Sequence, residues 1–229
     1  MNGVSVIIAA YNEEENIGNA VDSVYAALKN LISDYEIVII DDGSTDDTRK
    51  IIAVLSKSDK KIKIITHSQN MGFGSAIQDG IKRATKKYIT GFPGDNDMST
   101  YSFRELIKAR KSADLIISYM ANPGSRPLLR RIASRFFVIM MNILFGLNLK
   151  YFNGYLVTRT KLVKSLPLHS NGLAIFAEII VRLIKKGVSY KEVPFIHKER
   201  KTHKSKALSI NSVTQTLATI GALVKDIYL

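Results

Sequence analysis

Short apolar runs alternate with helix-like segments over the first 120 residues. The run Val4–Ala10 is apolar almost throughout, which is typical of a strand buried on both faces. Apolar residues in 13–28 then recur every three or four positions, the spacing of one helix face. The alternation continues, with strands expected over 35–40, 62–65, 88–91 and 115–117, and helices over 46–55, 73–85 and 101–111. This order predicts βαβ units, and therefore an α/β fold with a mostly parallel central sheet flanked by helices.

Acidic residues follow three of the predicted strands. In a parallel sheet the ligand binds outside the carboxyl ends of the strands, so these positions are candidates for a site. Tyr11-Asn12-Glu13 follows the first strand, Asp41-Asp42 ends the second, and Asp95-Asn96-Asp97 follows the fourth. A turn or a helix cap explains one Asp at such a position, but it does not explain pairs. The pairs therefore favour a functional role.

The spacing of Asp95 and Asp97 suits a hard divalent cation. Two carboxylates on a tight turn can hold Mg²⁺ or Mn²⁺ together with phosphate oxygens of a substrate, and the metal then offsets charge on a departing diphosphate. The chain contains neither a P-loop nor a Gly-x-Gly-x-x-Gly dinucleotide fingerprint after its first strand. Gly72 and Gly74 either bring backbone close to a ligand or simply begin a helix.

The net charge and the absence of Cys limit the kinds of partner and chemistry that the chain can have. The 229 residues carry 33 Lys and Arg against 20 Asp and Glu, a net charge of +13, and no Cys. The absence of Cys excludes a disulfide framework and a thiol nucleophile. Positive charge gathers in two clusters, Arg126–Arg135 and Lys198–Lys206. Phosphate-bearing molecules and an anionic membrane surface would suit this charge, whereas no aromatic residues interleave with the clusters as nucleic-acid binding would favour.

Two apolar segments raise the question of a membrane. Residues 136–149 hold 11 apolar residues in 14, too few to span a bilayer, and predict either a helix lying on an anionic membrane or a buried helix. An apolar stripe from Ile210 to Ile227 predicts an amphipathic helix that packs on the body, on lipid or on a second copy of the chain. Because Met1-Asn2-Gly3 leads directly into a strand, we expect a cytoplasmic protein, peripheral on the cytoplasmic face of a membrane.

Four ordered motifs resemble those of family 2 glycosyltransferases. They are the residues from Val4 to Glu14, from Ile39 to Asp46, Asn70-Met71-Gly72, and Gly94-Asp95-Asn96-Asp97. Within the family, the chain is most similar to polyprenyl-phosphate glycosyltransferases of the dolichol-phosphate mannose synthase type. The resemblance implies a GT-A fold, a nucleotide-sugar donor such as GDP-mannose or a UDP-sugar, Mg²⁺ or Mn²⁺, and an inverting transfer to a polyprenyl or dolichyl phosphate.

The resemblance also assigns residues to roles. It implies a donor site made by Ala9, Tyr11, Glu13, Asp41, Asp42, Gly72 and Asp95, a metal held by Asp95 and Asp97, and phosphates bound by Arg130, Arg131 and Arg200. The chain departs from the family in three places, and one of them is the usual Asp-Pro-x-Ser-Gly segment, which reads Tyr151-Phe152-Asn153-Gly154 here. The usual Asp-Leu-Gln reads Asp97-Met98-Ser99, so a Gln metal contact is lost. The usual Gly-Ser-Arg reads Ser118-Tyr119-Met120, and Arg126 is a candidate replacement for that arginine.

The acceptor decides whether the reaction needs a base. A polyprenyl phosphate is already anionic, so it requires orientation and charge neutralisation rather than proton removal. A hydroxyl acceptor would require a carboxylate base, for which Glu178 is the candidate, although Glu178 equally suits a surface ion pair with Arg182 four residues on.

We expect a nucleotide-sugar half over 1–120, an acceptor half of the same domain over 121–206, and a C-terminal amphipathic helix over 207–229. The alternatives are a glycosyltransferase with a glycan or other hydroxyl acceptor, and a non-catalytic protein that binds nucleotide sugars or anionic surfaces.

Overall fold

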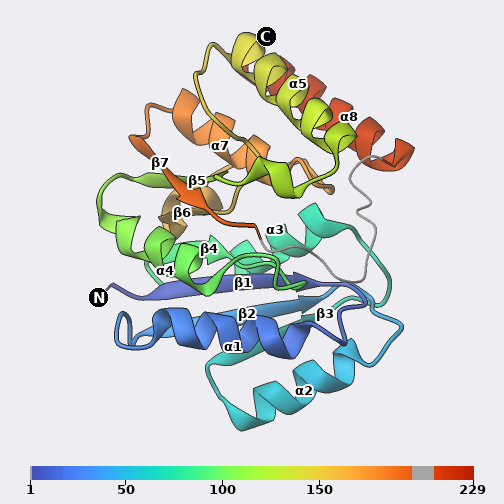
Figure 1. The fold of residues 1–229 in the computed structure, drawn as a ribbon, viewed down its shortest axis with the longest axis vertical. Helices are drawn as coiled ribbons and strands as arrows, with labels where there is room; N and C mark the ends of the chain where they lie inside the picture. Colours follow the sequence, from blue (N-terminus) through green and yellow to red (C-terminus); the bar gives the residue numbers. More distant parts are fainter. Residues whose placement is uncertain (1, 198–208) are drawn as a thin grey trace.

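The computed structural model describes residues 2–197 and 209–229. One sheet of seven strands, in the order β3-β2-β1-β4-β6-β5-β7, runs through the molecule (Figure 1). The strands are β1 (Val4–Ala10), β2 (Tyr35–Asp41), β3 (Ile62–Thr66), β4 (Tyr88–Gly91), β5 (Leu115–Met120), β6 (Leu156–Arg159) and β7 (Tyr190–Phe195). The helices are α1 (Ile17–Leu28), α2 (Thr48–Ser58), α3 (Phe73–Arg83), α4 (Thr100–Lys108), α5 (Leu128–Phe145), α6 (Thr160–Lys164), α7 (Ile175–Lys185) and α8 (Ile210–Tyr228), with short 3₁₀ turns at Ala109–Lys111 and Pro123–Ser125.

The predicted fold class is confirmed. Strands β3, β2, β1 and β4 pair in parallel, β7 pairs in parallel with β5, and β6 alone runs antiparallel between β4 and β5. The pattern analysis found β1 to β5 and missed the last two strands. Strand β6 has only four residues, and β7 is an edge strand with mostly exposed or half-buried side chains and a proline, so neither carries a clear apolar pattern.

The two faces of the sheet are covered by separate apolar clusters. Side chains of α3 and α7 pack on one face with Ile7 of β1, and side chains of α1 and α4 pack on the other with Val6 and Ile8. Because successive side chains of a strand point to opposite faces, β1 fills both clusters and is apolar at every position except Ser5, whose buried hydroxyl bonds to Glu36. The result is a three-layer α/β sandwich.

Helix α5 combines the two expectations for the apolar segment 136–149. The helix begins earlier, at Leu128, and ends at Phe145, where Gly146 adopts the left-handed conformation. Met141 and Phe145 are buried against the body, and the Phe145 ring stacks on that of Tyr228 in α8. The opposite face is exposed. In the described part of the chain, none of the helices has the length and hydrophobicity needed to cross a bilayer.

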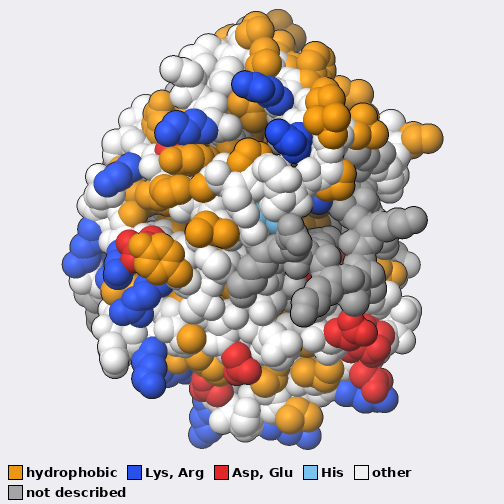
Figure 2. Space-filling model, in the orientation of Figure 1, with side chains coloured by type: hydrophobic (Ala, Val, Ile, Leu, Met, Phe, Trp, Pro, Cys, Tyr) orange, Lys and Arg blue, Asp and Glu red, His pale blue; other side chains and the backbone are white. Residues whose placement is uncertain are grey.

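Exposed apolar side chains form a ridge over α5 and α8. On α5 they follow the helical repeat, and on α8 only the first half contributes, since Ile220 and Leu223 in the second half are buried. Figure 2 shows this apolar surface along the upper right edge, where Figure 1 places both helices. The ridge consists of Leu128, Leu129, Ile132, Phe136, Ile139 and Ile143 of α5 with Ile210, Val213 and Leu217 of α8.

Candidate functional site

The loops after β1, β2 and β4 meet at the carboxyl edge of the sheet. These three strands are neighbours and parallel, so their ends are adjacent. The loop after β4 runs closely past the end of β1, because the Phe92 amide donates to the carbonyl of Ile7 at 2.8 Å. A Cβ atom at Gly94 would lie 2.6 Å from the carbonyl oxygen of Ala9, so only glycine fits there. This approach brings the Asp95–Asp97 turn beside Ala9.

The loop after β1 is fastened to the loop after β2. The Asn12 amide donates to Ser44 Oγ at 3.0 Å, and the Glu13 amide donates to Thr48 Oγ1 at 2.8 Å. Asn12 has a φ of 55°, a left-handed conformation that Asn tolerates better than most residues. These contacts explain why the predicted helix over 13–28 begins only at Ile17. They also hold Tyr11 and Glu13 at the carboxyl edge.

Asp41 organises the loop that follows its own strand. One carboxylate oxygen accepts a hydrogen bond from the Ser44 amide at 2.9 Å, and the other pairs with Nε of Arg49 at 2.8 Å. The side chain is buried, and both oxygens have internal partners. In this arrangement Asp41 shapes the wall of the site from within the protein.

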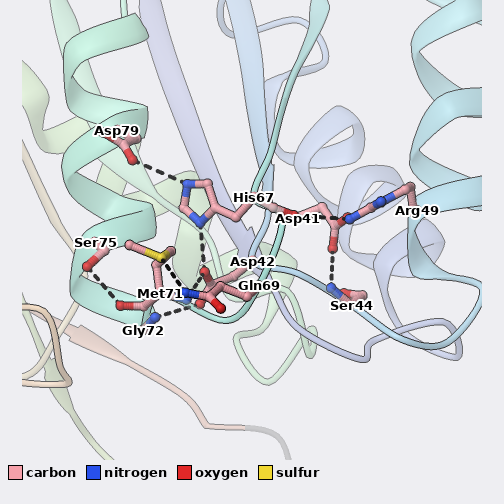
Figure 3. Close-up of polar contacts among 10 residues, drawn as sticks. All are labelled: Asp41, Asp42, Ser44, Arg49, His67, Gln69, Met71, Gly72, Ser75 and Asp79. Carbon is pink, nitrogen blue, oxygen red and sulfur yellow. Dashed lines mark hydrogen bonds and ion pairs between the residues drawn. The ribbon is translucent and has the colours of Figure 1, made fainter.

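Asp42 joins the β2 loop to the start of α3. Its carboxylate accepts hydrogen bonds from the amides of Met71 at 2.8 Å and Gly72 at 2.9 Å, and it lies 2.7 Å from Nδ1 of His67 (Figure 3). The other ring nitrogen of His67 lies 3.2 Å from Asp79 of α3. The structure therefore brings together Asp42 and Gly72, two predicted donor-site residues that are thirty positions apart.

Gly72 also closes against the second half of the chain. Its φ is 97°, and a Cβ atom there would lie 2.5 Å from the carbonyl oxygen of Asn171. The backbone N–H of Gly74, two residues further on, donates to the same carbonyl oxygen at 2.9 Å. The segment around Asn171 thus packs directly on the loop that Asp42 holds.

The Asp95–Asp97 turn faces a buried histidine. Oδ1 of Asp95 accepts a hydrogen bond from the Asp97 amide at 3.3 Å, and Asn96 between them has a φ of 54°. Oδ2 of Asp97 lies 3.3 Å from Nε2 of His197, which follows β7. The backbone of His197 is held on both sides by Asn122, which donates to its carbonyl and accepts from its amide, each at 2.9 Å.

Charged and phenolic groups from the second half reach this turn. Burial lowers the pKa of the Arg130 guanidinium and the nearby charge of Arg126 lowers it further, while Asp97 acts in the opposite sense. Burial raises the pKa of the Tyr155 hydroxyl well above its ordinary value, and the charges of Asp97 and Glu13 add to the rise. Arg130 and Tyr155 therefore lie within electrostatic reach of Asp97, and Tyr155 is a neutral hydrogen-bond donor at neutral pH.

Arg126 points inward from the turn before α5. It donates to the Tyr151 hydroxyl at 3.1 Å, and its Nε is buried with no hydrogen-bond partner among the described residues. Arg131, by contrast, is exposed on α5. Arg200 and the cluster Lys198–Lys206 lie outside the described residues.

Glu178 occupies the interior of the second half. Its side chain is fully buried on α7 and accepts hydrogen bonds from the amides of His169 and Ser170, and it pairs with Arg182 at 2.9 Å. Arg182 pairs in turn with Asp226 of α8 at 2.7 Å. The expected ion pair between Glu178 and Arg182 is present, but its expected place on the helix surface is wrong. A base at this position would have to leave all of these partners.

The sequence analysis assigned no role to His67, Tyr155 or His197. Each is a single polar residue in or beside an otherwise ordinary segment, and no spacing marks it. In the described part of the chain, no three acidic, histidine or cysteine side chains form a cluster that could hold a metal by themselves.

The family is decided by comparison with known proteins. The model for "Glycosyl transferase family 2" matches residues 5–163, more than half of the chain, including the loops after β1, β2 and β4. The chain belongs to glycosyl transferase family 2. An uncharacterized family relative from Haemophilus influenzae, named as a glycosyltransferase, is 37% identical over 93 residues, which are 41% of this chain and 28% of that protein.

Two further comparisons cover most of the chain. The undecaprenyl-phosphate 4-deoxy-4-formamido-L-arabinose transferase of Yersinia pestis is 27% identical over 205 residues, which are 89% of this chain and 62% of that protein. The chain thus spans less than two thirds of the length of these curated relatives. Glucosyl-3-phosphoglycerate synthase from Mycobacterium tuberculosis, crystallised with UDP, superposes with a TM-score of 0.73 at 19% identity over 98% of this chain and 80% of that one. The likeness confirms the GT-A fold.

Proposed function

We propose that this family 2 enzyme transfers a sugar, with inversion, from a nucleotide diphosphate sugar to a polyprenyl or dolichyl phosphate at a membrane surface. The observation that carries the proposal is the meeting of three features at one edge of the sheet. These are the loop held by Asp42 and Gly72, the Asp95–Asp97 turn, and the half-buried arginines Arg126 and Arg130.

The donor, GDP-mannose or a UDP-sugar, would lie against the loops after β1, β2 and β4. Ala9, Tyr11 and Glu13 line this edge, and Asp42 and Gly72 support it. A divalent cation, Mg²⁺ or Mn²⁺, supplies charge neutralisation for the departing diphosphate when it is bound. Carboxylate oxygens are ligands that both ions accept, so the turn fits such a metal. The M. tuberculosis structural neighbour was crystallised with Mn²⁺, UDP-glucose and phosphoglyceric acid, which supports a metal and a nucleotide sugar in this fold.

The acceptor assignment rests on the arginines and on Glu178. A phosphate acceptor needs no general base, and Glu178 already has internal partners on both carboxylate oxygens. Arg126 and Arg130 are placed to neutralise phosphate charge, with Arg131 and Arg200 as further phosphate ligands. The name of the Yersinia pestis relative, an undecaprenyl-phosphate transferase, supports a lipid phosphate.

The apolar ridge and the arginines of α5 suit the surface of an anionic membrane. Each Lys or Arg near such a surface contributes on the order of 1 kcal/mol, and exposed apolar side chains add to the binding where they enter the interface. In this reading, residues 1–120 bind the donor, 121–206 bind the acceptor, and 207–229 support the membrane-facing side.

The donor and metal are tested by measuring the affinity of GDP and of UDP with and without Mn²⁺. We expect one of the two to bind with a strong dependence on the metal, and Asp97→Asn to remove this dependence and most of the turnover. Asp47→Asn is the matched control, because the Asp47 side chain is exposed and pairs with Lys50 at the surface. Metal-independent binding, or full activity of the Asp97 variant, would contradict the metal assignment.

The acceptor is tested with a short polyprenyl phosphate. Arg130→Ala removes a charged hydrogen-bond donor worth roughly 1.5–3 kcal/mol, so kcat/KM for this acceptor should fall ten- to hundredfold while donor affinity changes little. Arg159→Ala is the control, since its guanidinium forms an exposed pair with Asp114. Equal activity on the dephosphorylated polyprenol would favour a hydroxyl acceptor instead.

Membrane binding is tested by flotation with vesicles that contain anionic lipid. Wild type should float at low salt and less at high salt, and the double variant Phe136→Ser and Ile143→Ser should float several-fold less. Val54→Ser on α2 is the control, because Val54 is equally exposed but lies outside the ridge. If the ridge instead pairs two copies of the chain, flotation fails for wild type and light scattering shows a dimer that the double variant loses.

A further inference from the structure

The ring of His67 lies between two acidic side chains from different elements. His67 directly follows β3, and only 11% of its side chain is exposed. Nδ1 lies 2.7 Å from Oδ1 of Asp42, which follows β2, and Nε2 lies 3.2 Å from Oδ2 of Asp79 on α3 (Figure 3). Neither His67 nor Asp79 belongs to the four motifs that carry the family resemblance.

These two contacts determine the charge of the ring. An ionised carboxylate only accepts hydrogen bonds, and a neutral imidazole donates through one nitrogen alone. Both distances suit hydrogen bonds, which requires a proton on each ring nitrogen and therefore the imidazolium form. The positive ring thus lies between two negative groups. Asp79 also pairs with Lys82 through its other oxygen at 2.8 Å.

The backbone of His67 is fixed as well. Its amide donates to the carbonyl of Asp41 at 2.9 Å, and its carbonyl accepts from Nη2 of Arg49 at 3.1 Å. Arg49 in turn pairs with the Asp41 carboxylate. Because both the ring and the main chain are held, His67 can fix the position of a neighbouring side chain.

That neighbour, Asp42, has an oxygen with acceptor capacity left. Oδ1 accepts from the His67 ring and from the Met71 amide, and Oδ2 accepts from the Gly72 amide at 2.9 Å. Within the described part of the chain, these are three hydrogen bonds, whereas a carboxylate has about four acceptor positions. The remaining position is on Oδ2, the oxygen that His67 does not contact.

The burial of Asp42 makes the positive ring necessary. Its side chain is 4% exposed, and a buried carboxylate without a positive partner is costly. Without the ring, Oδ1 would keep only the Met71 amide, and the carboxylate would turn toward water or another donor. Such a rotation would move Oδ2 as well.

We propose that His67 is a positioning residue for the nucleobase of the donor. Held by Asp79, its imidazolium fixes the Asp42 carboxylate so that Oδ2 accepts a hydrogen bond from a ring N–H of the base. This inference rests on the proposed function, since it assumes that Asp42 contacts the donor. Guanine and uracil both carry a ring N–H beside a carbonyl group, so the arrangement serves either donor.

NMR of protein labelled with ¹⁵N at histidine tests the state of the ring. The two nitrogens of an imidazolium have nearly equal chemical shifts, whereas those of a neutral ring differ widely. At neutral pH we expect the imidazolium pattern for His67 in wild type. Asp79→Ala removes the outer carboxylate at a partly exposed position and should shift the ring toward the neutral form. A neutral His67 ring in wild type would overturn the inference.

Titration calorimetry with Mn²⁺ present tests the consequence for binding. His67→Gln should weaken whichever of GDP and UDP the wild type binds by about tenfold or more, the worth of one hydrogen bond with a charged partner. Mn²⁺-pyrophosphate, which lacks base and ribose, should bind wild type and variant equally. Asp79→Ala should weaken the nucleotide several-fold, and it serves as the test if circular dichroism shows that His67→Gln is unfolded. His169→Gln is the matched control, because that ring also faces an acid, Asp226 at 3.3 Å, but on the α8 side of the molecule.

The outcomes separate this inference from the proposed function. Nucleotide that binds wild type, His67→Gln and Asp79→Ala equally overturns the role of His67 and leaves the proposed transfer intact. Equal losses for nucleotide and for pyrophosphate indicate general damage to the site and overturn the role as well. If the wild type binds neither GDP nor UDP, the donor assignment of the proposed function is itself contradicted.

Discussion

Replacing Glu178 by Gln should lower the free energy of unfolding by several kcal/mol. It should change kcat little at temperatures where the variant is still folded. One carboxylate oxygen accepts from the His169 amide and from the Arg182 guanidinium, and the other accepts from the amides of His169 and Ser170. A glutamine amide carries one NH₂ group. In either orientation of the amide, its NH₂ group faces a hydrogen-bond donor. Arg182 loses its ion pair with residue 178 and keeps the one with Asp226.

The expected cost follows from burial. The exposed fractions of the Glu178 and Arg182 side chains are 0% and 6%, so the pair is largely out of water. Breaking a buried ion pair by removing one partner typically costs about 3–5 kcal/mol. For a domain of this length, that corresponds to a fall in Tm of about 10 °C.

The assay combines urea and thermal unfolding with kcat measured well below the Tm of the variant. Glu105→Gln is the matched control, because it removes an acid from an exposed pair with Lys108 and should change stability by under about 1 kcal/mol. The reasoning is refuted if Glu178→Gln unfolds like wild type while its kcat falls a hundredfold or more. That result would identify Glu178 as a base and favour a hydroxyl acceptor.

Two further substitutions test other parts of the structure. Burial raises the pKa of Glu36, but hydrogen bonds led by that from Lys63 outweigh it and lower the pKa from 4.5 to about 2. The carboxylate should therefore stabilise the fold above pH 4.5 by about 3 kcal/mol, and this contribution should be lost as the pH falls toward 2. Glu36→Gln should flatten that part of the curve of stability against pH, which urea unfolding measures. Gly72→Ala should lower the free energy of unfolding by about 1–3 kcal/mol, because the added Cβ meets Asn171 and residue 72 has a positive φ. It should also weaken nucleotide binding in titration calorimetry. Gly18→Ala on α1, where the added Cβ meets open space, should be neutral or stabilising. Equal effects of the two glycine substitutions would contradict this.

The strands that the sequence predicted correctly share one property. β1 and β2 are buried on both faces, so nearly every residue must be apolar, and a continuous apolar run between turn residues is visible without any structure. β6 and β7 lack that mark because one is very short and the other lies at the edge. The apolar pattern left the place of helix α5 open, since its apolar residues cover two faces, of which only one meets the core.

What the sequence by itself determined is local: the order of βαβ units, the acids that follow strands, and the motifs that placed the chain in its family. Apolar runs and helical spacing involve residues that are close together in the chain, so they can be recognised in the sequence. Contacts between remote residues do not. His197 meets Asp97 only because β7 joins the edge of the sheet and Asn122 positions its end, and Glu178 is interior only because the turn at His169 folds over α7. The tertiary structure alone decided these pairings, since a polar residue carries no local sign of the distant group that it will face.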